Sequence, residues 1–309
     1  MPCVLALIVL SILGLFSASH RKLAKEAFDC VFRRVTLRPC NTGFDTKVKV
    51  AILGRLINRS PALTKFVSQR FELLSWILII TMTASFGWTA RGLYNFWAWG
   101  DCNGPNSGGF CAFDPTGANN KVSSMDEGNC VDAKLAIKNL SLKPLNLADY
   151  PSMGTEQNQI VFLGCYDCDY TRKAWPMMQV LLKKIPATFT FIHFPTKPET
   201  KYLMAYDYCV YQENPDVFWQ YVERMFSNTK EQNADEAQIQ TMLESLGLKR
   251  EAVSACVQAL ETKQIVEKRF NQIQTTGIYG TPTVFVNGTP VVGPKPERVY
   301  RRLLKGGLF

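Results

Sequence analysis

A pair of cysteines between a strand pattern and a helix pattern constrains this chain most. Residues 160 to 163 form a short apolar run, Gly164 follows it, and Cys165-Tyr166-Asp167-Cys168 comes next. Residues 171 to 184 then repeat apolar side chains with the period of a helix. We expect Cys165 to lie at the helix N-terminus, where backbone N–H groups and the helix dipole stabilise a thiolate. Cys168, one turn later, is then placed to attack a mixed disulfide formed by Cys165.

Two uncharged apolar runs precede this region, at 3–19 and 73–90. Each lies at the short end of the roughly 17 to 25 residues that cross a hydrocarbon core. We therefore predict transmembrane helices over residues 1–19 and 73–91. A cleaved signal peptide fits the first run less well, because Arg21, Lys22 and Lys25 follow that run instead of preceding it. The alternative is that both runs are buried helices of a soluble protein.

The segment between the runs is strongly basic. Residues 20 to 71 hold twelve Lys/Arg against three Asp/Glu, which equals the whole net charge of +9. By the positive-inside rule we predict a basic cytoplasmic helical loop over residues 20–72, with the N-terminus and everything after about residue 92 outside. Its first part fits a basic amphipathic helix, lying either on an anionic leaflet or against its own neighbours. Nucleic acid is not a favoured partner, because this charge lies between the two membrane helices. Cys30 and Cys40 are expected as free thiols in a reducing compartment, with a redox role left open.

Residues 92–154 are predicted to be an extracytoplasmic linker. From Gly100 to Asp149 the chain is rich in Gly, Asn, Ser, Pro and Asp. An interfacial aromatic belt is expected just before it, formed by Trp88, Tyr94, Phe96, Trp97 and Trp99. Cys102 and Cys111 bracket a flexible loop and are well placed for a structural disulfide in an oxidising compartment. The states of Cys3 and Cys130 are left open.

The rest of the chain alternates strand and helix patterns. A strand is predicted over 188–194, and a long helical region follows over about 199–275. Gly280-Thr281-Pro282-Thr283 then leads into a strand at 284–286. Asn287-Gly288 is a strong hairpin turn before a returning strand, and residues 296–304 read as a final amphipathic helix.

Residues 155 to 306 resemble the DsbA-like branch of the thioredoxin superfamily. The resemblance rests on "CYDC", "FIHFP", "AYDYCVYQENPDVFWQYVERMF" and "GIYGTPTVFVNGTPVVG". It implies an α/β chain with a thioredoxin-like fold and a large helical insertion over residues 155–309, here preceded by two transmembrane helices.

The resemblance also implies roles for single residues. Cys165 would be the exposed nucleophile and Cys168 the buried resolving cysteine. Thr281 and Pro282 would form a cis peptide bond that presents backbone groups to a substrate chain. Tyr166 and Asp167 are also expected to contact that substrate. Some relatives carry a second disulfide in the insertion, so Cys209 and Cys256 are candidates, with buried free thiols as the alternative. His193 matches a family position and is interpreted as a strand residue without a catalytic role.

One departure from the family concerns the dipeptide between the cysteines. It is Tyr-Asp, where the strongly oxidising relatives have Pro-His. The negative charge of Asp167 is expected to raise the pKa of Cys165 and give a less oxidising couple.

These patterns predict a two-pass protein of the cytoplasmic membrane that exchanges disulfides with protein substrates on the outer side. No cofactor and no resident metal are implied. The expected partners are proteins with thiols or disulfides, and a membrane partner that is either a quinone-linked oxidant or a thiol-transferring reductant. Two alternatives use the same residues: a metal-delivery module that binds copper(I) through both thiolates, and a thioredoxin-like subunit that only mediates interactions. Zinc is less favoured, because no second ligand pair stands at zinc-binding spacing.

Overall fold

The computed structural model describes residues 18–36, 46, 50, 53–54, 57, 60–105, 109–124 and 140–306. The chain divides into two units, residues 1–90 and residues 91–309, which are considered separately. The predictions for Cys3, Cys40 and Cys130, and most of the first apolar run, lie outside the described residues.

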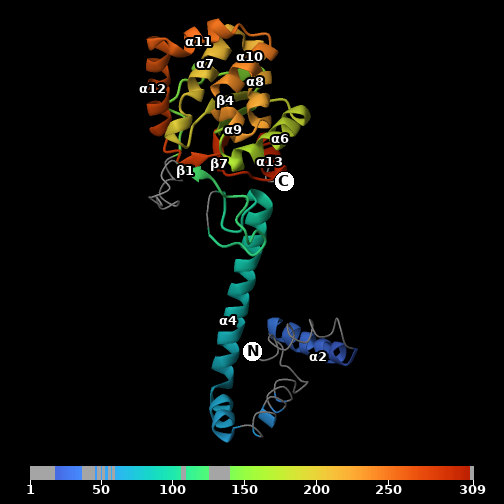
Figure 1. Ribbon diagram of the computed structural model, residues 1–309. Helices are drawn as coiled ribbons and strands as arrows, with labels where there is room; N and C mark the ends of the chain where they lie inside the picture. The colour runs from blue at the N-terminus through green and yellow to red at the C-terminus, as the bar shows by residue number, and fades with distance from the viewer. Residues whose placement is uncertain are drawn as a thin grey trace. The chain divides into compact units, whose positions relative to one another are not determined.

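The described part of the first unit is helical. Helix α2 spans Ala18–Val35, and α4 spans Pro61–Trp99 and so ends in the second unit (Figure 1). Helical geometry in α4 is interrupted at Arg70, and the second predicted membrane run lies wholly within this helix. Over the residues that can be described, no single helix has both the length and the apolar composition to cross a membrane. The bent pair Thr64–Leu74 and Trp76–Trp99, which meets at 52°, has both when its two parts are taken together.

Helix α2 has a buried side and an exposed aromatic side. Ala27 and Cys30 are fully buried, whereas Phe28 and Phe32 are more than half exposed and stack at 6.2 Å between ring centroids. Cys30 is disulfide-bonded, so the prediction of a free thiol is wrong at this position. A disulfide is typical of an oxidising compartment, not of the reducing one on which that prediction depended.

The second unit is built on a five-stranded mixed sheet with the order β2-β4-β3-β6-β7. The bounds of its strands are β2 Ser152–Met153, β3 Gln159–Gly164, β4 Thr188–His193, β6 Thr283–Val286 and β7 Thr289–Val292. Strands β3 and β4 are parallel, and the other neighbours are antiparallel. Valine, isoleucine and phenylalanine dominate the central strands, which suits strands buried on both faces.

The hairpin between β6 and β7 forms where it was predicted. Asn287 and Gly288 adopt φ angles of 47° and 79°. Positive φ at both positions defines a tight turn whose twist matches that of the flanking strands. Asn287 also accepts a hydrogen bond from the Gln159 backbone N–H at 2.8 Å, which ties the turn to the start of β3.

Helices occupy the remainder of this unit. Helix α6 spans Asp169–Lys184 and contacts α13, Glu297–Leu304. The predicted helical insertion is a group of shorter helices (Figure 1), preceded by two 3₁₀ turns in the chain. Their bounds are η1 Leu147–Asp149, η2 Pro198–Thr200, α7 Leu203–Glu213, α8 Pro215–Ser227, α9 Lys230–Ala234, α10 Glu236–Ser245, α11 Arg250–Gln258 and α12 Leu260–Gln274. Capping residues set several of these boundaries, among them Asn214 before α8 and a Thr229/Gln232 capping box on α9.

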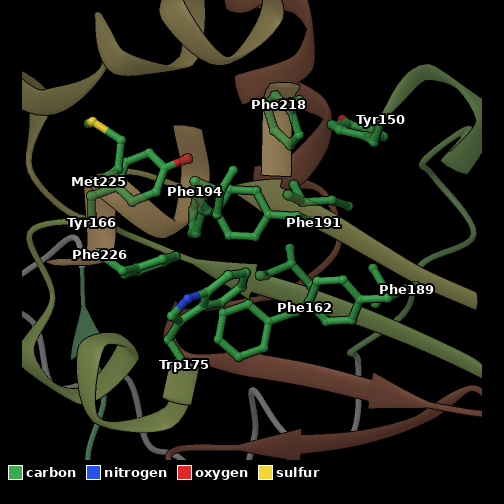
Figure 2. Packing of buried hydrophobic residues seen from close by; sticks show 14 of the residues in the cluster. Tyr150, Phe162, Tyr166, Trp175, Phe189, Phe191, Phe194, Phe218, Met225 and Phe226 are labelled. Atoms are coloured by element: carbon green, nitrogen blue, oxygen red, sulfur yellow. The ribbon is translucent and has the colours of Figure 1, made fainter. Parts of the chain in front are cut away.

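The core joins the sheet to α6 and α8 through aromatic side chains (Figure 2). Phe162 of β3 meets Trp175 of α6 edge-on at 5.9 Å, and Trp175 stacks on Phe226 of α8 at 4.6 Å. Phe226 in turn meets Tyr166, between the two cysteines, at 4.8 Å. This aromatic cluster therefore packs against the turn that carries the cysteine pair.

The segment before the sheet contains the predicted disulfide between Cys102 and Cys111. Just before this disulfide, the end of α4 contacts helix α13. Arg298 of α13 donates to the Trp97 carbonyl, and the guanidinium of Arg302 lies 4.3 Å from the ring centroid of Trp99. The end of α4 thus packs against an amphipathic helix of the domain, whereas Trp88 is 80% exposed. Within the predicted aromatic belt, the Trp99 ring therefore contacts α13, whereas the side chains of Trp88, Tyr94 and Trp97 are exposed.

Candidate active site

The two cysteines lie in the turn between β3 and α6. Strand β3 ends at Gly164, Cys165 follows it, and Cys168 is the N-cap of α6, which begins at Asp169. Its sulfur accepts a hydrogen bond from the backbone N–H of Thr171 at 3.4 Å. The prediction that Cys165 occupies the helix N-terminus is therefore wrong, because Cys165 stands three residues before the N-cap and Cys168 takes that place.

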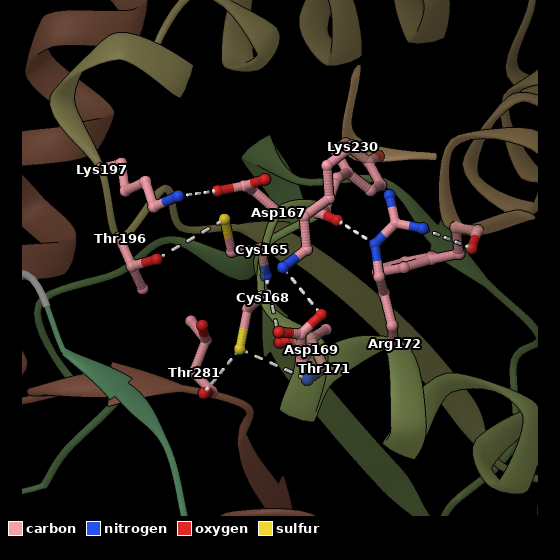
Figure 3. A network of polar contacts seen from close by, with 12 residues as sticks. Cys165, Asp167, Cys168, Asp169, Thr171, Arg172, Thr196, Lys197, Lys230 and Thr281 are labelled. Atoms are coloured by element: carbon pink, nitrogen blue, oxygen red, sulfur yellow. Dashed lines mark hydrogen bonds and ion pairs between the residues drawn. The ribbon is translucent and has the colours of Figure 1, made fainter. Parts of the chain in front are cut away.

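The cysteine pair meets the loop around Pro282, more than a hundred residues later in the chain (Figure 3). The Cys168 thiol donates to the Thr281 carbonyl at 3.2 Å. The peptide bond between Thr281 and Pro282 is cis, and both residues are buried. The structure therefore brings together four of the residues expected to form one site.

A short strand covers one edge of this loop. Strand β1, Ser123–Ser124, pairs antiparallel with β5, Gly280–Thr281, in a separate two-stranded sheet. Ser123 lies opposite Thr281. A Cβ at Gly280 would lie 2.7 Å from the Ser123 carbonyl oxygen, so the close approach requires glycine there.

Cys165 is fully buried, which contradicts the exposed nucleophile implied by the resemblance. The segment after β4 packs against its turn. The hydroxyl of Thr196 lies 3.8 Å from the Cys165 sulfur, and Lys197 forms a 2.6 Å ion pair with Asp167 (Figure 3). These contacts hold the neighbouring segment against the turn that carries the buried sulfur.

A groove of about 460 Å³ adjoins this ion pair. Its charged lining consists of Asp167, Lys197, Glu199, Lys230 and Glu231. The expected position of Asp167 beside a substrate is compatible with this groove, because its side chain remains partly exposed there.

Tyr166 points into the protein instead of toward the groove. It is fully buried, and its hydroxyl donates to Asp207 of α7 at 3.0 Å. The prediction that Tyr166 contacts a substrate is therefore wrong: its ring packs among Phe191, Tyr221 and Phe226.

His193 is a site residue that the sequence interpretation missed. Its Nδ1 lies 2.8 Å from the Asp207 carboxylate, and both side chains are almost completely buried. Burial lowers the pKa of His193, but the charge and hydrogen bond of Asp207, with a contribution from Cys165, raise it to about 9. The available signal was register: His193 ends β4 directly beside Gly164, which ends the parallel strand β3. The carboxyl ends of parallel strands meet at one edge, so His193 had to lie near Cys165.

These groups decide the ionisation of Cys165. Burial raises the pKa of its thiol, but the hydrogen bond and charge of His193 and the backbone N–H groups of Thr196 and Asp167 lower it below its ordinary value. The pKa of Cys165 is therefore lowered, opposite to the rise that was expected from the sequence. Lys197 pairs with that carboxylate, and the Asp167 backbone N–H favours the thiolate.

Arg172 is a second residue that the sequence interpretation missed. Its Nε donates to the Tyr166 carbonyl at 2.6 Å, and its Nη1 donates to the Phe226 carbonyl at 3.1 Å. It thereby ties the cysteine turn to the end of α8, where the carbonyls that close a helix need donors.

The remaining described cysteines are paired. Cys209 of α7 and Cys256 of α11 form a disulfide within the helical insertion, and among the described residues Cys165 and Cys168 are the free thiols. No group of three or more His, Cys, Asp or Glu side chains in the described ranges is arranged to hold a metal ion.

A mixed sheet with parallel β3 and β4, a Cys-x-x-Cys turn at the end of β3 and a cis-proline before β6 together define a thioredoxin-like fold. Residues 162–306 also match the model of a family described as thioredoxin. None of the curated proteins matches this chain.

Solved structures of low sequence identity resemble the chain. The thiol-disulfide exchange protein alpha-DsbA2 from Wolbachia pipientis is 16% identical, with 56% of this chain and 94% of that one covered and a TM-score of 0.49. The catalytic domain of Proteus mirabilis ScsC is 18% identical, over 57% and 98%, with a TM-score of 0.47. BdbD from Bacillus subtilis is 19% identical, over 53% and 92%, with a TM-score of 0.45. The assignment of the fold depends on the site geometry and the family match, not on these distant structures.

Proposed function

We propose that this chain is a thiol-disulfide oxidoreductase that exchanges disulfides with protein substrates through Cys165 and Cys168. The observation that carries the proposal is the placement of two free thiols beside the cis Thr281–Pro282 bond, with the pKa of Cys165 lowered. A lowered thiol pKa supplies the thiolate that thiol-disulfide exchange requires near neutral pH.

The exchange proceeds in two attacks. A substrate thiolate attacks the Cys165 sulfur of the Cys165–Cys168 disulfide, and the Cys168 sulfur leaves and takes up a proton. The second thiolate of the substrate then attacks the substrate sulfur that is bonded to Cys165, and the Cys165 sulfur leaves. Two electrons pass from the substrate dithiol to the enzyme disulfide, and the reverse sequence reduces a substrate disulfide.

The proposal places residues 91–309 outside the cytoplasm, next to a membrane that α4 enters. Two disulfides in this unit support an oxidising compartment. The length and composition of the bent helix pair in α4 support an anchor. For residues 20–72, the basic charge favours the cytoplasmic side, whereas the disulfide of Cys30 favours the opposite side. A membrane partner, either a quinone-linked oxidant or a thiol-transferring reductant, would return the cysteine pair to its starting state.

Trapping of a mixed disulfide tests the proposed chemistry. Reduced Cys168→Ser protein is expected to accumulate a covalent complex with a disulfide-containing protein substrate, because the sulfur that would resolve the complex is gone. Non-reducing electrophoresis followed by mass spectrometry identifies the linkage at Cys165. Cys165→Ser is the matched control and should form no complex. A complex of equal yield in both variants, or in neither, would contradict the proposal.

A further inference from the structure

The buried pair of His193 and Asp207 has a geometry that a purely structural ion pair does not need. Asp207 accepts from the Tyr166 hydroxyl at 3.0 Å on one carboxylate oxygen and meets His193 Nδ1 at 2.8 Å on the other. Both oxygens are therefore engaged, and the imidazole is fixed in one orientation. This is the arrangement in which an acid orients a histidine toward a nucleophile.

The other ring nitrogen of His193 is left for Cys165. Nε2 is buried, and among the described residues no acceptor meets it in full hydrogen-bond geometry; the group with which it interacts is the Cys165 sulfur. An unsatisfied buried donor is costly unless a charged acceptor forms nearby. Gly164, directly before Cys165, pairs with His193 across the sheet, and the ring centroid of Tyr166, directly after Cys165, lies 4.5 Å from that of His193. Both chain neighbours of Cys165 are therefore next to the imidazole.

The surroundings of this pair hold few competing charges. A cavity of about 30 Å³, large enough for one water molecule, opens beside it. The titratable groups that face the pair from the packed elements are Cys165 and Tyr166 from the turn, Tyr221 from α8, Tyr150, Tyr208, Tyr211, and Arg269 from α12. Burial holds the pKa of Tyr166 and of Tyr221 well above the ordinary value, and burial raises that of Tyr150 to about 12. At neutral pH these three buried tyrosines are therefore neutral, and the charge that changes during the exchange is that of Cys165.

We propose that His193, oriented by Asp207, supplies the positive charge that stabilises the Cys165 thiolate when it leaves the mixed disulfide, and so directs the exchange toward oxidation of substrate dithiols. This inference rests on the proposed function. His193 acts on the reacting sulfur, and Asp207 is its positioning residue. The positive charge thus comes from a histidine at the end of β4, whereas the dipeptide between the two cysteines contains no histidine.

The proton balance follows from this arrangement. The substrate dithiol gives up two electrons and two protons. Cys168 takes one proton as it leaves the enzyme disulfide, and the other passes to solvent, since His193 is already protonated and Cys165 remains a thiolate beside it. Stabilising that thiolate favours the reduced enzyme, and a couple with a stabilised reduced form is a stronger oxidant.

A double-mutant cycle over His193→Gln and Asp207→Asn tests the proposal. Two quantities are measured on the full chain: the pKa of Cys165, from the ultraviolet absorbance of the thiolate against pH, and the equilibrium constant with glutathione. His193→Gln is expected to raise the pKa of Cys165 by at least about one unit and to make the couple about tenfold less oxidising. Asp207→Asn should shift both quantities in the same direction.

The cycle also separates orientation from independent charge effects. If Asp207 acts through His193, the double variant differs little from His193→Gln alone. Lys184→Gln, which breaks an exposed ion pair with Glu297 far along α6, is the control and should change neither quantity. An unchanged Cys165 pKa in folded His193→Gln overturns the role of His193. An unchanged pKa in folded Asp207→Asn, or additive effects, overturns the positioning role of Asp207. Trapping of a mixed disulfide is measured alongside with the Cys168→Ser variant, in which His193 and Asp207 are intact. This measurement distinguishes these failures from a failure of the proposed function itself.

Discussion

Two ion pairs flank the same cysteine, and they differ mainly in their exposure to water. In the pair of His193 and Asp207, the side chains are 2% and 10% exposed. In the pair of Lys197 and Asp167, they are 52% and 15% exposed. Separations of 2.8 Å and 2.6 Å make the two pairs nearly equal in geometry. Their expected energies nevertheless differ, because solvent screens an exposed pair and cannot screen a buried one.

This difference gives the two pairs separate tasks. The buried pair holds a charge close to Cys165 and changes the ionisation of that thiol. The exposed pair lies beside a groove, on the residue two positions after Cys165. An exposed pair typically contributes about 0–1 kcal/mol, so breaking it costs little. We therefore expect the buried pair to set the reactivity of the sulfur and the exposed pair to affect access to it.

The largest expected difference between the pairs lies in the pH dependence of stability. The pKa of His193 is about 9 in the folded reduced protein, above the ordinary 6.5. Its contribution is therefore fully present below pH 6.5 and is lost as the pH rises through about 9. Asp207→Asn should lower the free energy of unfolding by up to about 3 kcal/mol at the acidic end, and by much less above pH 9. Denaturant unfolding of the reduced protein across this range measures the loss.

Asp167→Asn is the matched substitution in the exposed pair. It should change the free energy of unfolding by less than about 1 kcal/mol at any pH in this range. Equal losses in the two variants would show that burial does not distinguish the pairs.

The second largest expected effect concerns Arg172, whose guanidinium donates to carbonyl oxygens and not to a carboxylate. Arg172→Met removes the bonds to the carbonyls of Tyr166 and Phe226 and should cost about 2 kcal/mol of unfolding free energy. Urea unfolding at low and high salt checks both the size and the cause. Because the bonds are short-range, the loss should persist in about 1 M salt. A loss that disappears in salt would place Arg172 with the exposed pair.

The smallest expected effect is on access to the sulfur. Lys197→Gln should increase the rate at which iodoacetamide alkylates Cys165 by about two- to fivefold, after correction for the thiolate fraction. In the wild-type protein, added salt should give part of the same increase. A rate that does not change would mean that the exposed pair does not affect access to the sulfur.

The sequence alone predicted the framework of the domain well. The strands around the cysteine pair, the helical insertion, the Asn287-Gly288 turn and the closeness of Cys168 to Thr281 all follow from local patterns or the family resemblance. Side-chain direction was harder to predict. Tyr166 is buried because α7 and α8 pack over the turn, and no periodicity within "CYDC" indicates that packing. The expected rise in the pKa of Cys165 was wrong, because the lowering comes from His193, which stands on another strand, and from backbone N–H groups. The Asp167 carboxylate itself pairs with Lys197, thirty residues later. A pair formed across the fold changes a charge that local sequence presents as isolated.

The pairing of β1 with β5 affects how an extended polypeptide can bind at the edge of β5. A polypeptide that binds by strand addition needs unpaired backbone groups at a sheet edge. Next to Pro282 the edge of Gly280–Thr281 is already engaged by Ser123–Ser124. An incoming chain that seeks this edge must displace part of the protein itself, and only two residues hold that place. An incoming polypeptide therefore competes at this edge with Ser123–Ser124, which belong to the protein itself and are always present. Only a polypeptide that pairs with the edge better than this segment does would replace it.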